Sequence, residues 1–213
     1  MDATLKTPRT THRRNPSRGS HERAVIDAIL DEGLVAHVGL AVEGRPFVLP
    51  MVFARVGDAL FLHGARASRL LGASAQGAEL CVTVTVLDGL VLARSAFHHS
   101  MNYRAVMVFG RGAEVLDPAR KRLAFDALVD RIAKGRARQA RPASDHELAA
   151  TTVVELAIDE ASAKVREGGP KDDAGDVAWP CWAGHVPLRL TPGTPIPAPD
   201  LPLQLTREAP SLR

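Results

Sequence analysis

The sequence predicts a mainly β protein with peripheral helices, built as a closed or partly closed antiparallel barrel. Six or seven short runs rich in apolar and β-branched residues follow one another, and glycine- or aspartate-containing pairs separate them. Alternating strand–helix units are absent, which argues against a doubly wound parallel sheet. The chain of 213 residues is 46% hydrophobic and 24% charged, so a wholly disordered or fibrous protein is also excluded.

Each element follows from local periodicity and from its boundary residues. The expected strands are 34–42, 47–54, 59–63, 80–87, 90–96, 103–116 and 152–165. The expected helices are 22–31, 66–75, 117–132 and 145–149. Gly33 ends the first helix, and Asp117-Pro118 opens the third. Asp88-Gly89 is the strongest short hairpin signal in the chain, and we expect it to form the turn between two strands.

Charge and proline content divide the chain into three parts. Residues 1–23 carry six basic and two acidic side chains, a net charge of +4, whereas the remainder has a net charge of −1. We expect residues 1–20 to form a basic flexible arm or one that wraps a partner. We do not expect nucleic acid as a partner, because the arm has no interleaved aromatic residues. Residues 21–190 form the barrel domain, and 191–213 form an extended proline-rich tail.

Cysteine content and hydropathy indicate a reducing, aqueous environment. Cys81 and Cys181 stand a hundred residues apart without a CxxC pattern, so we expect two thiols and no structural zinc. No apolar stretch reaches the roughly 20 residues that span a bilayer, and the polar N-terminus lacks the apolar core of a signal peptide. A cytoplasmic protein without membrane contact is the expectation.

The segment 62–71 contains a strand end, a glycine and a helix start with two arginines and a serine. Backbone amides at a helix start favour an anion, and Arg66 and Arg69 can converge on one oxyanion. This pattern is typical of a monoester phosphate site. An equally good interpretation is a solvated helix start that Ser68 simply caps.

The segment 93–104 places polar side chains between two strands. His98 and His99 are adjacent and are expected to face opposite sides of an extended chain, with no carboxylate or cysteine nearby in the sequence. We therefore predict no metal site. One histidine is a candidate hydrogen-bond partner for a ligand, but a turn satisfied by its own side chains is the favoured interpretation.

Both tryptophans of the chain, Trp179 and Trp182, lie in one segment rich in proline and glycine. A planar ligand or a subunit interface would use them, and a simple staple over the barrel would too. The chain has no GxSxG, Walker, GxGxxG or HExxH motif, which disfavours hydrolase, P-loop and Rossmann functions.

Taken together, these segments resemble the flavin-nucleotide-binding branch of the pyridoxamine 5′-phosphate oxidase-like family, similar to the nitroimidazole-resistance proteins. The resemblance covers residues 21–199. Its main carriers are Gly44-Arg45-Pro46-Phe47, His63-Gly64-Ala65-Arg66-Ala67-Ser68-Arg69-Leu70, His99-Ser100-Met101-Asn102-Tyr103-Arg104, Ser162-Ala163-Lys164-Val165-Arg166 and Trp182-Ala183-Gly184. It implies an FMN-binding split β-barrel of six to seven antiparallel strands, and a homodimer with the flavin at the subunit interface.

The resemblance also assigns cofactor-binding residues. Arg66, Ser68 and Arg69 would hold the FMN phosphate, while His63 and Gly64 would line the same groove. A strand backbone and a segment at the dimer interface would flank the flavin ring, and one aromatic residue would reach it from the partner subunit. The strand backbone is that of Pro50, Met51, Val52 and Phe53. The segment at the dimer interface contains Ser95, His99 and Tyr103, and the aromatic residue of the partner subunit is Trp182. The catalytic residues stay unassigned.

Two departures from the family pattern bear on activity. Ala105 stands where relatives commonly carry a serine hydroxyl. Thr191 replaces a substrate-binding histidine in the pattern of true pyridoxamine 5′-phosphate oxidases, so that activity is disfavoured. The leading hypothesis is a flavin-dependent oxidoreductase acting on a small organic acceptor. The alternative is a non-catalytic flavin sensor or store.

Overall fold

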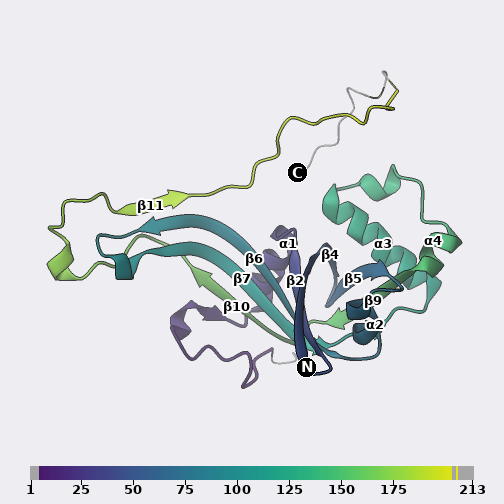
Figure 1. Cartoon of the computed structure of the whole chain (residues 1–213), viewed down its shortest axis with the longest axis horizontal. Coiled ribbons are helices and arrows are strands. Elements are labelled where there is room, and N and C mark those ends of the chain that lie inside the picture. Colours follow the sequence, from purple (N-terminus) through teal and green to yellow (C-terminus); the bar gives the residue numbers. More distant parts are fainter. Residues whose placement is uncertain (1–4, 203–204, 206–213) are drawn as a thin grey trace.

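Two antiparallel sheets form the protein, as a computed structural model that describes residues 5–202 and 205 shows (Figure 1). The strands are β1 (Gly19–Ser20), β2 (Ala36–Val42), β3 (Arg45–Met51), β4 (Phe53–Val56), β5 (Ala59–Ala65), β6 (Glu79–Leu92), β7 (Ser100–Arg111), β8 (Ala113–Glu114), β9 (Thr151–Ala157), β10 (Glu160–Arg166) and β11 (Gly184–Pro187). The α-helices are α1 (Arg23–Glu32), α2 (Arg69–Ala75), α3 (Pro118–Ile132) and α4 (Asp145–Ala150). The mainly β class is thus confirmed.

The larger sheet has the order β1-β10-β7-β6-β2-β3, with β11 on β6, and the smaller one has the order β4-β5-β9-β8. The main core lies between them and includes Leu62 from the small sheet, Val84 from the large sheet and Ile26 from α1, all fully buried. With seven and four strands, the sheets exceed the predicted six or seven. Three long runs divide and β1 and β11 are short additions, while the predicted strands 80–87 and 90–96 form the single strand β6.

The divided runs are those in which the chain passes from one sheet to the other. The predicted strand 47–54 is two strands separated at Val52, and 152–165 is two strands separated at residues 158–159. At the third crossing, after β7, a Cβ on Gly112 would lie 2.5 Å from Val154 Cγ1. The apolar pattern continues through all three crossings, because both sheets face one core, so periodicity alone shows no boundary.

The hairpin predicted at Asp88-Gly89 is wrong. Both residues lie inside β6, which runs without interruption to Leu92, and the pairing with β7 shifts register between Leu87 and Gly89 as at a β-bulge. A Cβ on Gly89 would lie 2.8 Å from Val186 O, so this glycine admits the close approach of β11 rather than a turn. The chain reverses instead around the 3-10 turn Ala96–His98.

The predicted helices are present with shifted ends. Asp117 caps α3 by accepting from Arg120 N at 2.8 Å, and Ser144 with Glu147 forms a capping box at α4. Helix α2 starts at Arg69 and not at the predicted residue 66, because Ala65 still belongs to β5. No helix among the described residues is long and apolar enough to cross a membrane.

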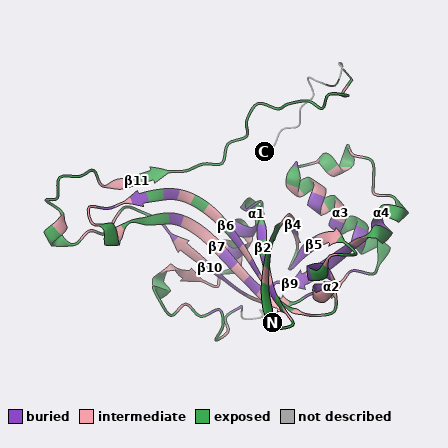
Figure 2. Cartoon of the chain, viewed as in Figure 1, coloured by how far each residue is buried: buried purple, intermediate pink, exposed green. Residues whose placement is uncertain are grey.

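The N-terminal segment lies along the barrel of its own chain. Leu5 and Thr10 are buried, and β1 pairs with β10. Arg9 forms ion pairs with Glu79 and Glu160. In Figure 2 the described tail that follows β11 is green, and so exposed, throughout most of its length. Over residues 191–202 the tail contributes no strand.

Candidate functional site

A pocket of about 240 Å³ brings together two of the residues predicted to bind phosphate. Ser68 and Arg69 lie at its edge, at the start of α2. Its walls are apolar side chains of β2, β3 and α2, namely Leu40, Val42, Phe47, Leu49 and Leu70. The Arg69 guanidinium lies 6.0 Å from the Phe47 ring centre and takes part in none of the ion pairs of the described residues. The pocket therefore combines an apolar wall with an uncompensated cation.

Ser68 has a structural role in the same place. Its hydroxyl accepts a hydrogen bond from Leu71 N at 3.4 Å and so caps α2, as the alternative interpretation of this segment expects. A hydroxyl retains its own proton as a donor while it accepts, so capping and contact with an anion are compatible. Arg66 is exposed and does not line the pocket. Of the three residues predicted to bind phosphate, the pocket therefore contains Ser68 and Arg69 but not Arg66.

His63 and Gly64 have different neighbours in the structure, and their place beside the phosphate groove stays a prediction. Successive side chains of a strand point to opposite faces. On β5, Leu60 and Leu62 belong to the main core, whereas Ala59 and Phe61 belong to a second cluster beneath α3. His63 follows the second set, and its ring centre lies 6.3 Å from that of Phe125 on α3. A Cβ on Gly64 would lie 2.7 Å from Leu71 Cδ1, so Gly64 admits α2.

The His63 ring has an unusual environment. Its Nδ1 atom is buried and has no hydrogen-bond partner among the described residues. Burial lowers the pKa of the imidazole, which favours the neutral form, the form that coordinates metals. His63 is therefore a candidate ligand on the α3 side of the small sheet, away from the pocket of Ser68 and Arg69.

The segment from Pro50 to Phe53 joins the two sheets. Pro50 and Met51 end β3, Val52 is the crossing residue, and Phe53 begins β4. The Phe53 side chain is fully buried in the main core, with the Arg131 guanidinium 5.2 Å from its ring centre. Phe53 as a whole residue has no exposed surface, so within this segment solvent reaches only Pro50, Met51 and Val52.

Ser95, His98 and His99 form a turn in which their polar groups hydrogen-bond to one another. Ser95 Oγ lies 3.0 Å from His98 Nδ1, and His99 Nδ1 lies 2.9 Å from Ser95 O. The other face of His98 meets Asp173 and Asp176, and the three ligand atoms lie within 4.8 Å of one another. Sequence reasoning found no carboxylate near the histidines because these two lie more than seventy residues downstream. The prediction of no metal site stays untested.

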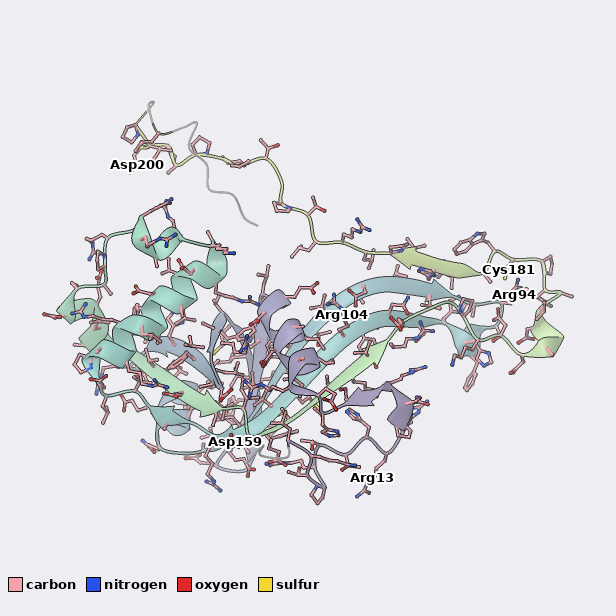
Figure 3. All side chains as sticks on the ribbon, turned by 180° about the vertical axis from the view of Figure 1, so that it is seen from behind. Arg13, Arg94, Arg104, Asp159, Cys181 and Asp200 are labelled. Carbon is pink, nitrogen blue, oxygen red and sulfur yellow. The ribbon has the colours of Figure 1, made fainter. Side chains whose placement is uncertain are left out.

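The predicted interface residues lie on a long projection. We use the term hairpin extension for residues 88–102, which include the end of β6 and the start of β7, together with residues 170–188, which include β11. Figure 3 shows Arg94 and Cys181 at its far end. Trp182 is 64% exposed there, and Gly184 leaves room for its ring, since a Cβ would lie 2.8 Å from Trp182 Cη2. Tyr103 pairs with Arg166 at the base of the extension.

The structure therefore divides the predicted site between two regions. The barrel holds the pocket of Ser68 and Arg69, and the hairpin extension of the same chain holds Ser95, His99 and Trp182 at a distance (Figure 1). Sequence reasoning missed the apolar pocket walls Leu40 and Leu49. The signal available in the sequence was a hairpin with apolar residues at successive positions, and period-2 reasoning alone cannot assign these to one face.

An antiparallel split barrel with a cation at the edge of an apolar pocket defines a class of small-ligand-binding β-barrels. The family model of pyridoxamine 5′-phosphate oxidase matches residues 22–165, and the chain belongs to this family. A search of the curated proteins finds no match.

Among solved structures, the flavocytochrome Anf3 from Azotobacter vinelandii is 40% identical over 92% of this chain and 94% of its own, with a TM-score of 0.85. The FAD and heme binding protein from Mycobacterium smegmatis is 41% identical over 92% of this chain and 99% of its own, with a TM-score of 0.83. A protein from Bacteroides thetaiotaomicron, named for 5-nitroimidazole antibiotic resistance, is 24% identical over 69% of this chain and 86% of its own, with a TM-score of 0.57. This last likeness concerns the fold alone.

Proposed function

We propose that the protein is a flavin-binding redox protein whose flavin phosphate lies at Ser68 and Arg69. The observation that carries the proposal is the Arg69 guanidinium, which stands at an apolar pocket without a carboxylate partner among the described residues. The names of two relatives at 40% and 41% identity, a flavocytochrome and an FAD and heme binding protein, support the same cofactor class.

The residues present fit a flavin nucleotide. Arg69 and the Ser68 hydroxyl offer charge-assisted hydrogen bonds to a phosphate, while Leu40, Phe47 and Leu49 offer an apolar surface. When bound, a flavin supplies hydride or single-electron transfer. The chain itself holds and orients the cofactor and keeps water from its apolar part. Oxidation of a small organic donor or reduction of a small acceptor is the corresponding activity.

The pocket is small for a whole flavin, which supports a homodimer. At about 240 Å³ it lies below the range of roughly 300–1,000 Å³ that is usual for ligand pockets. Meanwhile the hairpin extension presents Phe97, Trp179 and Trp182 to solvent. We propose that the extension of a second copy closes the pocket. Sedimentation velocity tests this, and a monomer at micromolar concentration would contradict it.

Arg69→Ala is expected to weaken flavin binding by roughly 1.5–3 kcal/mol, the cost of losing a charge-assisted hydrogen bond. Arg66→Ala is the matched control, because Arg66 does not line the pocket. Fluorescence titration of flavin-free protein with FMN and with FAD measures both variants and decides between the two nucleotides. Unchanged flavin affinity in the Arg69 variant would move the phosphate site away from α2, and equal losses in both variants would add Arg66 to the site.

A second cofactor is proposed on a separate observation, the buried and unpartnered Nδ1 of His63. A neutral histidine such as His63, beside the apolar ring of Phe125, would hold a haem iron, and two relatives are named as a flavocytochrome and as an FAD and heme binding protein. His63→Ala is expected to abolish the Soret shift on titration with haemin, whereas His146→Ala, on the exposed face of α4, preserves it. An unchanged Soret spectrum in the His63 variant would remove this ligand.

Two other activities remain alternatives that simple assays separate. A non-catalytic flavin sensor or store would bind flavin without turnover of electron donors. A pyridoxamine 5′-phosphate oxidase would form pyridoxal phosphate, and Thr191 in place of the histidine predicts that it does not.

A further inference from the structure

A second pocket, of about 300 Å³, opens at the base of the hairpin extension, where β10 ends beside β7 and where two residues of β11 also line the space. It shares no lining residue with the pocket of Ser68 and Arg69. The side chains that matter to its chemistry are Asp88, Asn102, Arg104, Arg166 and His185. Figure 3 places the labelled Arg104 on the hairpin near its base.

Arg166 is buried in this region, with only 6% of its surface exposed. Its guanidinium donates to Asn102 Oδ1, to Gly168 O at 3.0 Å and to Gly169 O at 3.2 Å. All three acceptors are neutral. Of the two N–H groups left, one is the second hydrogen of Nη2, and the other is Nε, which is buried and has no partner among the described residues. A buried donor without an acceptor is costly, which points to a group that binds here.

The charge of Arg166 is also uncompensated. The neighbouring cation Arg104 is held by two carboxylates, Glu32 and Asp88, whereas Arg166 takes part in none of the ion pairs of the described residues. Burial and the nearby positive charge of Arg18 lower the pKa of Arg166. A buried cation is normally paired, because its desolvation is otherwise unfavourable by several kcal/mol.

Glu167 does not supply the missing charge. It lines the same pocket, but its side chain is exposed and forms no ion pair within the described part of the chain. Asp88 is engaged in a two-bond contact with Arg104, 2.9 Å from Nε and 2.7 Å from Nη2. The pocket therefore offers a cation, an unused N–H donor and room for a few heavy atoms.

We propose that this pocket binds an anionic oxygen group, a carboxylate or a phosphate, with Arg166 Nε–H as its central donor. Exposed His185 and buried Asn102 line the space around the same group. The group has two chemical sources. It belongs either to a free small-molecule anion or, resting on the function proposed above, to an acidic substituent of a bound cofactor.

The test compares wild-type protein with Arg166→Gln and with Arg138→Gln. Arg138 is exposed on the turn Arg136–Arg138 and lines neither pocket, so its variant removes the same charge elsewhere. Purified full-length protein is titrated calorimetrically with sodium phosphate and with sodium acetate at constant ionic strength. Flavin and haem affinity are measured on the same samples by absorbance.

For a free anion, wild type and Arg138→Gln are expected to bind one of the two probes, and Arg166→Gln to bind it about tenfold or more weakly. For a cofactor-borne group, no probe binds to the loaded protein, and Arg166→Gln alone loses about tenfold in cofactor affinity. Absence of both effects overturns the proposal and leaves Arg166 as a tie between β10 and its following loop. The flavin absorbance of wild type reports separately on the proposed function, so the two failures are distinguishable.

Should Arg166→Gln not fold, Arg166→Lys takes its place. Lysine keeps the charge but presents a point donor in place of the planar guanidinium. It is expected to weaken the same binding severalfold. Affinities equal to wild type in the lysine variant would overturn the role of Nε.

Discussion

The barrel and the hairpin extension are built from the same strands, β6 and β7, yet they bury very different amounts of apolar surface. Within the barrel, Phe53, Phe61 and Leu62 are fully buried. Beyond Asp88 the same two strands gain only β11, which pairs along the edge of β6, and Phe97 is 87% exposed. The barrel is thus stabilised by its own core, while the extension presents an apolar surface suited to a partner.

The largest expected effect contrasts two phenylalanines, one in each region. Phe53→Ala is expected to lower the free energy of unfolding by about 3–5 kcal/mol, because it leaves a cavity between the two sheets. Phe97→Ala is expected to change it by less than about 0.5 kcal/mol. Urea denaturation followed by circular dichroism measures both. A loss in Phe97→Ala that grows with protein concentration would show that a second copy covers the extension.

The next effect concerns the attachment of α3 to the barrel. Arg131 donates to the carbonyls of Leu30, Asp31 and Gly33 at the end of α1, with Nη2 2.8 Å from Leu30 O. Arg131→Met is expected to cost about 2 kcal/mol of stability, since these hydrogen bonds from a charged donor are lost. Arg138→Met is the control, with no measurable change expected. Equal denaturation midpoints for the two variants would mean that α3 contributes little to the barrel.

Much of the fold could be predicted from the sequence, because strand and helix periodicity are local properties. The helix over 22–31 and the helix opened by Asp117-Pro118 are present with ends shifted by at most one residue. What failed depends on contacts distant in the sequence. Asp88-Gly89 has the composition of a turn, but it lies within a strand because β11, nearly a hundred residues later, packs against Gly89.

The candidate site shows the same limit. Ser68 and Arg69 were identifiable because a helix start and its capping residue are adjacent in the sequence. His63 was identifiable as a candidate too. The side of β5 to which it points was not, because that depends on the packing of Phe61 and His63 against α3. Arg166 gave no local signal as a buried cation. Its burial arises from Asn102 and from the loop after β10.

The smallest expected effect tests whether the extension opens independently of the barrel. Asp172, with 5% of its side chain exposed, accepts from Arg94 N and Arg94 Nη1, both at 2.8 Å, and ties residues 170–176 to the end of β6. Burial alone would raise the pKa of this carboxyl, but the two hydrogen bonds lower it below its ordinary value. An opened extension therefore binds more protons than the closed one in acid. The contact is fully present above about pH 4 and is lost as pH falls through the lowered pKa.

Both tryptophans of the chain lie in the extension, so their fluorescence reports on this region alone. Asp172→Asn is expected to shift the acid transition of tryptophan emission to a different pH or remove it, while far-ultraviolet circular dichroism of the barrel stays unchanged. Asp145→Asn, which breaks an exposed ion pair with Arg122 in the barrel, serves as the control. If circular dichroism and tryptophan emission change together in the Asp172 variant, the extension and the barrel unfold as one unit. The contrast between the two regions would then be one of exposure and not of stability, because the strands they share would transmit the loss of a single surface contact to the whole core.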